Sequence, residues 1–251
     1  MNANGGGSFD AGRGTFPEFL RLLDASETLN QSYEALRSSL RLLNGARPLK
    51  TLLFTSAQPE EGKTTVAVGL ALAMARAEKR VLIVDADLHR PKVHSLLGLQ
   101  NTKGLGDIIA GDLRDADAVR AIQIPALSGR QPRTLSVLTS GRTVANAFDA
   151  LQSPALEEVI RHVASVYDVV LIDAPPVLSV SDPLLLAPLV DGVVLIVKTG
   201  AVTEADARCA KERLDQVGAH ILGVVMNRYD ERLHGPGFHP YHGYYAAKLK
   251  G

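Results

Sequence analysis

The sequence of 251 residues contains a single cysteine, Cys209, and no tryptophan. One cysteine excludes a framework of intrachain disulfides and any metal or iron–sulfur site built from paired cysteines. The chain also has no excess of charge of either sign, because 27 basic residues balance 27 acidic ones. No overall field then attracts the chain to nucleic acid or to a membrane surface, and we expect no nucleic-acid partner.

Long apolar runs are missing as well. The longest, 66–75, is far shorter than the roughly 20 residues of a membrane-spanning helix. The first residues lack the basic and apolar regions of a secretory signal, so we expect a cytoplasmic protein. Hydrophobic residues nevertheless make up 46% of the chain, which is enough for a substantial core.

Apolar runs typical of buried strands recur along the chain and alternate with helical segments. The expected strands are 51–55, 81–84, 135–139, 168–172, 192–197 and 221–226, and the expected helices are 66–77, 105–111, 144–151, 154–165 and 203–217. Most of the strand runs are continuous in Val, Ile and Leu, which indicates strands covered on both faces. The alternation predicts an α/β fold with a doubly wound, mostly parallel sheet.

The chain is expected to divide into three regions. Residues 1–24 are predicted to be a flexible N-terminal segment, 25–230 one nucleotide-binding domain, and 231–251 a flexible tail rich in Tyr, His and Gly. A helix at the start of the domain is predicted by an apolar stripe with helical spacing: Leu29, Tyr33, Leu36, Leu40 and Leu43. Asn44-Gly45 is expected to end this helix.

The stretch 55–65, TSAQPEEGKTT, lies between an expected strand and an expected helix. This order builds a phosphate-binding loop, in which backbone N–H groups and a helix N-terminus face the anion. The expected loop residues are Ala57, Gln58, Pro59, Glu60, Glu61, Gly62, Lys63, Thr64 and Thr65. Ala57 stands where the usual pattern has its first glycine. Two carboxylates beside a triphosphate are unfavourable, so we expect Glu60 and Glu61 to turn outward.

Two further expected strands end in aspartates. The run 81–84 is followed by Asp85-Ala86-Asp87, and the run 168–172 by Asp173. Ligands of such a sheet gather at the carboxyl ends of its strands, where carboxylates hold Mg²⁺, usually through water. Asp173 alone is equally compatible with a structural role, but the three segments together favour a Mg²⁺–nucleotide site.

Three stretches of the chain resemble the bacterial tyrosine kinases, the autokinases of capsule and exopolysaccharide synthesis with a P-loop NTPase fold. They are TSAQPEEGKTT, then VLIVDADLHRPKVHSLLGL with Asn101 and Gly104-Leu105 after it, then YDVVLIDAPPVLSVSDPLLLAPLVDGVVLIV. The resemblance runs from about Ser32 to Asp230. Three departures stand out: Glu60 replaces a glycine, Gln31 and Glu34 break an early Glu-x-x-Arg-x-x-Arg motif that keeps Arg37, and the tail has few tyrosines.

The resemblance implies ATP and Mg²⁺ as cofactors and a role for each matching residue. Lys63 would neutralise the β- and γ-phosphates, and Thr64, Asp85 and Asp173 would surround Mg²⁺. Asp85 or Asp87 would accept the proton of the attacking tyrosine. The implied phospho-acceptors are Tyr241, Tyr244 and Tyr245. The alternative is that the tail is a disordered chain end with a few aromatic residues.

Two residues have alternative roles at this stage. Arg90 is expected either to approach phosphate or an acidic tail, or to form an ordinary ion pair with Asp85 or Asp87. Asn227 is expected either to contact the adenine or to cap the turn after its strand. For Glu60, a left-handed backbone would cost about 1–2 kcal/mol, whereas a right-handed one would be nearly neutral.

The resemblance also implies self-association, protein tyrosines as substrates, and a separate membrane-anchored polysaccharide co-polymerase as activator. That activator would recruit the chain to the inner face of the plasma membrane. Two other functions remain open. One is a non-kinase ATPase switch of the partition or septum-site type, which Gln58 disfavours because those proteins carry a second lysine there. The other is a nucleotide-binding regulatory subunit without kinase activity.

Overall fold

The computed structural model describes residues 16–43, 48–77, 79–125, 131–142, 144 and 146–229. Within these ranges the strands form a seven-stranded sheet in the order β3-β4-β2-β5-β1-β6-β7. The strands are β1 (Thr51–Ser56), β2 (Val81–Asp85), β3 (Arg120–Ile124), β4 (Arg133–Leu138), β5 (Val169–Asp173), β6 (Gly192–Lys198) and β7 (Ile221–Asn227). Only β3 runs antiparallel to its neighbour within this sheet.

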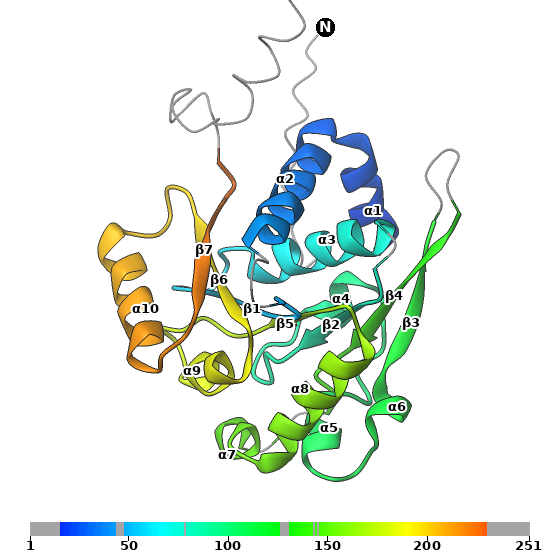
Figure 1. Ribbon diagram of the computed structural model, residues 1–251, viewed down its shortest axis with the longest axis vertical. Coiled ribbons are helices and arrows are strands. Elements are labelled where there is room, and N and C mark those ends of the chain that lie inside the picture. The colour runs from blue at the N-terminus through cyan, green and yellow to red at the C-terminus, as the bar shows by residue number, and fades with distance from the viewer. Residues whose placement is uncertain are drawn as a thin grey trace, which may run out of the picture.

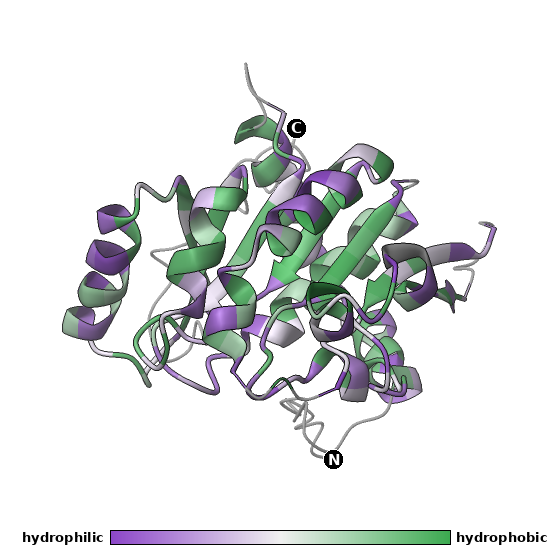
Figure 2. Ribbon diagram, turned by 90° about the horizontal axis from the view of Figure 1, so that it is seen from below, coloured by the Kyte–Doolittle hydropathy of each residue, from purple (hydrophilic) through white to green (hydrophobic). Residues whose placement is uncertain are grey.

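Helices cover both faces of the sheet (Figure 1). One layer consists of α1 (Phe16–Ala25), α2 (Glu27–Leu43), α3 (Lys63–Arg76) and α4 (Val93–Leu96). The other holds α5 (Leu105–Ile109), α6 (Asp115–Ala118), α7 (Ala147–Leu151), α8 (Pro154–Val166), α9 (Asp182–Leu186), a 3-10 turn at Ala187–Leu189 and α10 (Glu204–Gln216). The strands between the layers are strongly apolar (Figure 2). The doubly wound, mostly parallel sheet is therefore confirmed.

The N-terminal helix α1 corrects the expected domain boundary. The prediction that residues 1–24 are flexible is wrong for 16–24, which lie in α1. Its apolar side chains Phe19, Leu20 and Leu23 are buried, and Asp24 pairs with Arg76 of α3 at 2.8 Å. Residues 1–15 and the predicted tail 231–251, with Tyr241, Tyr244 and Tyr245, lie outside the described residues. No helix in the described ranges is long and apolar enough to span a membrane.

The helix predicted from the apolar stripe is confirmed as α2, and it packs directly on α3. Tyr33 is buried, and its hydroxyl donates to the Thr65 carbonyl at 3.2 Å. The ring lies against Gly69, where an added Cβ would come within 2.2 Å of the tyrosine hydroxyl. Gly69 thus allows α2 to approach the helix that follows the phosphate loop.

Candidate nucleotide site

The sheet order brings the three predicted segments together. Strand β5 lies between β2 and β1, and Asp173 is in register with Asp85 on one side and with Phe54 on the other. The loop after β1 therefore begins beside both aspartates. The strand order thus brings the three segments together at the carboxyl ends of their strands.

The loop from Ala57 to Gly62 turns directly into α3. Gly62 precedes the helix with a left-handed backbone, at φ +88°. Ala57 is fully buried and is not among the residues with positive φ, so its place in the loop requires no glycine. The missing first glycine of the sequence pattern is therefore no obstacle to the loop.

Lys63 lies among buried carboxylates. Its Nζ is 3.0 Å from Asp87 Oδ2 and 3.4 Å from Asp173 Oδ1, while the Thr64 hydroxyl donates to Asp173 Oδ2 at 2.6 Å. Burial lowers the pKa of Lys63, but the charges of Asp173 and Asp87 outweigh it and the pKa is raised. The lysine is thus held in its charged form at the start of α3.

Asp85 is completely buried and braces the loop that follows β2. Its Oδ2 accepts the N–H groups of Lys92 and Val93 at 3.1 and 3.0 Å, and its Oδ1 accepts that of Asp87 at 3.2 Å. Burial, with the nearby charge of Asp173, raises the pKa of Asp85 to about 8. Burial likewise raises the pKa of Asp173.

The oxygens of Thr64, Asp85 and Asp173 fit magnesium. Mg²⁺ prefers oxygen ligands, keeps several waters, and is usually bound by one or two carboxylates. No cluster of three or more His, Cys, Asp or Glu in the described ranges could hold a metal ion by itself. A small number of protein ligands is expected at a Mg²⁺ site whose other ligands are water and phosphate oxygens.

Arg90 does not form the ion pair considered from the sequence. Its backbone N–H donates to Asp87 Oδ1 at 2.9 Å, and among the described residues no ion pair joins its guanidinium to Asp85 or Asp87. Lys63 takes that place beside Asp87. The Arg90 side chain is exposed.

Asn227 closes the loop from the side. Its Nδ2 donates to the Glu61 carbonyl at 2.8 Å, and its Oδ1 accepts the N–H of Arg228 at 2.9 Å. It packs so tightly on Gly62 that an added Cβ there would lie 2.2 Å from Asn227 Nδ2. The turn-capping role is present; contact with adenine stays a prediction.

The two glutamates of the loop lie differently. Glu60 is exposed, as expected, but the prediction that Glu61 also turns outward is wrong. Its side chain is buried, with Oε1 accepting the Gln58 N–H at 2.5 Å and Oε2 the Lys198 N–H at 3.0 Å. Burial raises the pKa of Glu61 although these backbone hydrogen bonds lower it. Backbone donors at the end of β6 could not be foreseen from the sequence.

The backbone of Glu60 is left-handed, at φ +64°. A residue with a Cβ is strained there, so we expect Glu60→Gly to raise the free energy of unfolding by about 0.5–1 kcal/mol after the extra chain entropy of glycine is deducted. Urea denaturation measures the change. Glu60→Ala is the matched control, because it removes the same charge but keeps the Cβ. Equal stabilisation by both variants would contradict the strain argument.

His89 and Asp182 were not singled out from the sequence. Asp182, at the start of α9, is buried, and His89 Nε2 lies 2.9 Å from its Oδ2. The contact joins the loop after β2 to the segment that follows Asp173. A histidine and an aspartate so far apart in the sequence carry no pattern that would have revealed this.

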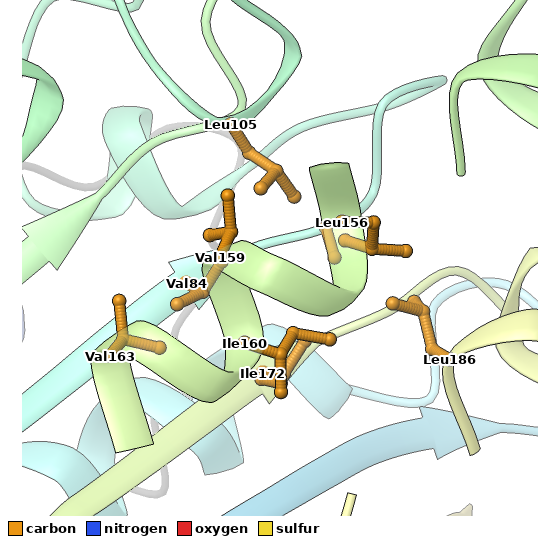
Figure 3. Close-up of a pocket in the computed structure, with 9 residues that line it drawn as sticks. Val84, Leu105, Leu156, Val159, Ile160, Val163, Ile172 and Leu186 are labelled. Atoms are coloured by element: carbon orange, nitrogen blue, oxygen red, sulfur yellow. The ribbon is translucent and has the colours of Figure 1, made fainter. Parts of the chain in front are cut away.

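A small cavity lies between α8 and the sheet (Figure 3). Its volume is about 10 Å³ and its walls are apolar, formed by Val84, Ala86, Leu105, Leu156, Val159, Ile160, Val163, Ile172 and Leu186. It is too small for a nucleotide and offers water no hydrogen-bond partner. The cavity is a packing gap in the core and has no part in the site.

Comparison with known proteins agrees with this geometry. Residues 60–203 match a family described as an AAA domain. The chain is 34% identical over 219 residues to tyrosine-protein kinase YwqD of Bacillus subtilis, covering 87% of both proteins. It is 30% identical to tyrosine-protein kinase wzc of Salmonella typhimurium over 88% of this chain but only 29% of that protein.

The chain is also similar in structure to a solved protein. The chimerical protein CapA2B2 superposes with a TM-score of 0.76 at 28% identity, over 84% of this chain and 89% of that one. The match to YwqD extends over most of both chains, and the fold superposes on that of a related structure. The chain therefore belongs to the bacterial tyrosine-protein kinases, with an AAA domain as its nucleotide-binding core.

Proposed function

We propose that this protein is an autophosphorylating protein-tyrosine kinase that uses Mg-ATP. The observation that carries the proposal is the arrangement of Lys63 between Asp87 and Asp173, with Thr64 bonded to Asp173. It places a cation, a hydroxyl and buried carboxylates at the start of a helix that follows a phosphate-type loop. Phosphoryl transfer needs such positioning and neutralisation of charge more than covalent chemistry.

Each residue has a distinct task in this proposal. Thr64, Asp85 and Asp173 would hold Mg²⁺, which would neutralise charge on the β- and γ-phosphates. Lys63 adds a second positive charge at the transferred phosphoryl group. Asp87 is the carboxylate proposed to accept the substrate proton: it accepts one backbone N–H, from Arg90, and pairs with Lys63, whereas Asp85 accepts three backbone N–H groups.

A tyrosine hydroxyl is the proposed nucleophile. Its ordinary pKa near 10 leaves it protonated at neutral pH, so a positioned base aids the attack. The phenolic oxygen bonds to the γ-phosphorus, the bond to the ADP oxygen breaks, and the phenolic proton passes to Asp87. The exposed Arg90 is placed to attract an acidic substrate segment or a phosphate. Tyr241, Tyr244 and Tyr245 are the proposed acceptors.

We also propose that the kinase regulates polymerisation and export of a capsule or exopolysaccharide. The match covers 87% of YwqD but only 29% of wzc, so this domain forms most of one relative and a minor part of a longer one. We therefore propose that a separate membrane-anchored activator serves the short form. Such an activator would recruit the chain to the inner face of the plasma membrane. Self-association is part of the proposal, although Glu34 pairs with Arg37 and Gln31 bonds Glu27 within α2 itself.

Incubation of the full chain with Mg-ATP tests the proposal. We expect phosphotyrosine on immunoblots, mapped by mass spectrometry to the tail and lost when Tyr241, Tyr244 and Tyr245 are all changed to Phe. The triple variant should still bind Mg-ATP. ATP hydrolysis without phosphotyrosine would favour the ATPase switch. If ATP at a hundred times its dissociation constant does not add about 2.7 kcal/mol to the free energy of unfolding, nucleotide binding itself is wrong.

A further inference from the structure

The phosphate loop is joined to the ends of β6 and β7 by a ring of hydrogen bonds. Glu61 Oε2 accepts the Lys198 N–H at 3.0 Å, and the Thr199 N–H donates to the Asn227 carbonyl at 3.0 Å. Asn227 Nδ2 closes the ring on the Glu61 carbonyl at 2.8 Å. Glu61 thus contributes both its side chain and its main chain to the junction.

The buried carboxylate of Glu61 has an unusual set of partners. Its side chain bonds backbone N–H groups at Gln58 and Lys198, and in the described ranges no lysine, arginine or histidine forms an ion pair with it. A buried charge is unfavourable unless hydrogen bonds compensate it, and N–H groups given to a carboxylate are among the stronger ones. The bond to Gln58 spans the turn of the loop and holds its two ends together.

The N–H groups on the other side of the loop are left available. Across the described residues, the N–H groups of 62–64 donate to no protein acceptor, whereas the Gln58 N–H is committed to Glu61. The first N–H groups of a helix have no intrahelical partner and bind anions readily. The hydrogen bonds of the Glu61 carboxylate therefore do not use the N–H groups at the start of α3, which stay available to bind phosphate.

We propose that Glu61 is a positioning residue, whose carboxylate fixes the phosphate loop to β6 and pre-forms it for the polyphosphate of the nucleotide. The inference rests on the proposed Mg-ATP site but not on kinase activity. Charge alone gives the opposite expectation, since removal of a carboxylate near a triphosphate should tighten binding. If the loop has its binding conformation in only a fraction of the molecules, the apparent affinity for nucleotide is lowered by that fraction.

Dissociation constants of Mg-ATP and Mg-ADP, measured by calorimetry well below the unfolding temperature, test the proposal. Glu61→Ala should weaken both about tenfold, which corresponds to the loss of one charge-assisted hydrogen bond. Glu61→Gln keeps one acceptor oxygen and should recover part of that loss. Unchanged or tighter binding in a folded Glu61→Ala protein would overturn the proposal, even if its stability were lowered.

Two matched variants distinguish the positioning role of Glu61 from effects of overall stability and of loop charge on nucleotide binding. Asp191 also accepts backbone N–H groups, from Lys50 at 2.9 Å and Thr51 at 2.8 Å, but at the opposite end of the sheet. Asp191→Asn should lower stability and leave both dissociation constants unchanged. Glu60→Gln removes an exposed charge from the loop without removing a hydrogen bond and should tighten binding slightly. Tenfold weakening by either variant would contradict the role of Glu61.

Hydrogen exchange covers the case in which Glu61→Ala does not fold. In the wild-type protein without nucleotide, the amides of Gln58 and Lys198 should exchange at least tenfold more slowly than the neighbouring amide of Glu60. Equal exchange of the three amides would overturn the proposal. Failure of the wild-type protein to bind nucleotide would instead refute the Mg-ATP site itself, so the two failures are distinguishable.

Discussion

Lys63→Ala is expected to abolish detectable phosphotyrosine and to lower the rate of phosphoryl transfer at least 100-fold. The lysine forms ion pairs with Asp87 and Asp173 and is held at the start of α3. Removing one preorganised group that stabilises transition-state charge has effects of this size. Phosphotyrosine formation over time with saturating Mg-ATP measures the change.

The same substitution should also destabilise the fold, and more so at higher pH. Removing one partner of a buried ion pair costs about 3 kcal/mol. The Lys63 charge lowers the pKa of Asp85 and of Asp173, so both pKa values should rise further in the variant. A carboxyl with a raised pKa in the folded state keeps a proton that the unfolded chain releases above about pH 4, so stability falls as pH rises. Urea denaturation at pH 5 and pH 8 should show the larger loss at pH 8.

Lys50→Ala is the control for Lys63→Ala. The Lys50 ammonium donates to the Ala164 carbonyl at 3.1 Å, in an exposed position at the far end of the sheet. Its removal should change neither phosphotyrosine formation nor the pH dependence of stability. If Lys63→Ala retained wild-type phosphotyrosine, the proposed mechanism would be refuted.

Gly104→Ala is expected to lower the free energy of unfolding by about 3 kcal/mol or more, the largest effect on stability that we predict for a single methyl group. An added Cβ would lie 2.1 Å from the Thr139 carbonyl oxygen and 2.3 Å from the Gly141 nitrogen. Both are backbone atoms, so no rotamer change relieves the contact. Asn101 and Asp107 join the same two loops by accepting the N–H groups of Gly141 and Arg142, which prevents the loops from moving apart.

Gly192→Ala provides a matched comparison. Its added Cβ would also be crowded, at 2.5 Å, but only by side-chain atoms of Leu222, which can rotate. We expect a loss less than half that of Gly104→Ala in the same denaturation experiment. Similar losses at the two positions would show that rigid backbone contacts do not dominate at Gly104.

The parts of the fold that could be predicted are those with a strong local pattern. Runs such as 192–197 are apolar throughout because both sheet faces are covered, and each strand predicted from such a run is present. Strand β3 was missed because it is an antiparallel edge strand with alternating burial. Helix α1 was missed because it follows a glycine-rich stretch.

The site could be predicted as a set of residues but not as a network. Lys63, Asp85, Asp87 and Asp173 follow strands whose carboxyl ends must meet, so their proximity follows from the fold class. The inward turn of Glu61 depends on a backbone N–H at Lys198, far along the chain. Contacts that depend on one distant donor leave no periodicity or spacing in the sequence.

The position of β1 between β5 and β6 has a consequence for synthesis of the chain. Thr51 pairs with Val170, and Leu52 with Gly192, so the strand that leads into the phosphate loop has both its neighbours in the second half of the chain. At ordinary rates of translation, the ribosome needs on the order of ten seconds to make them. During that time the apolar residues of β1 have no sheet to enter. We therefore expect this nascent strand to be prone to aggregation until its partners are made, and the loop it carries can reach its final shape only after β6 has emerged.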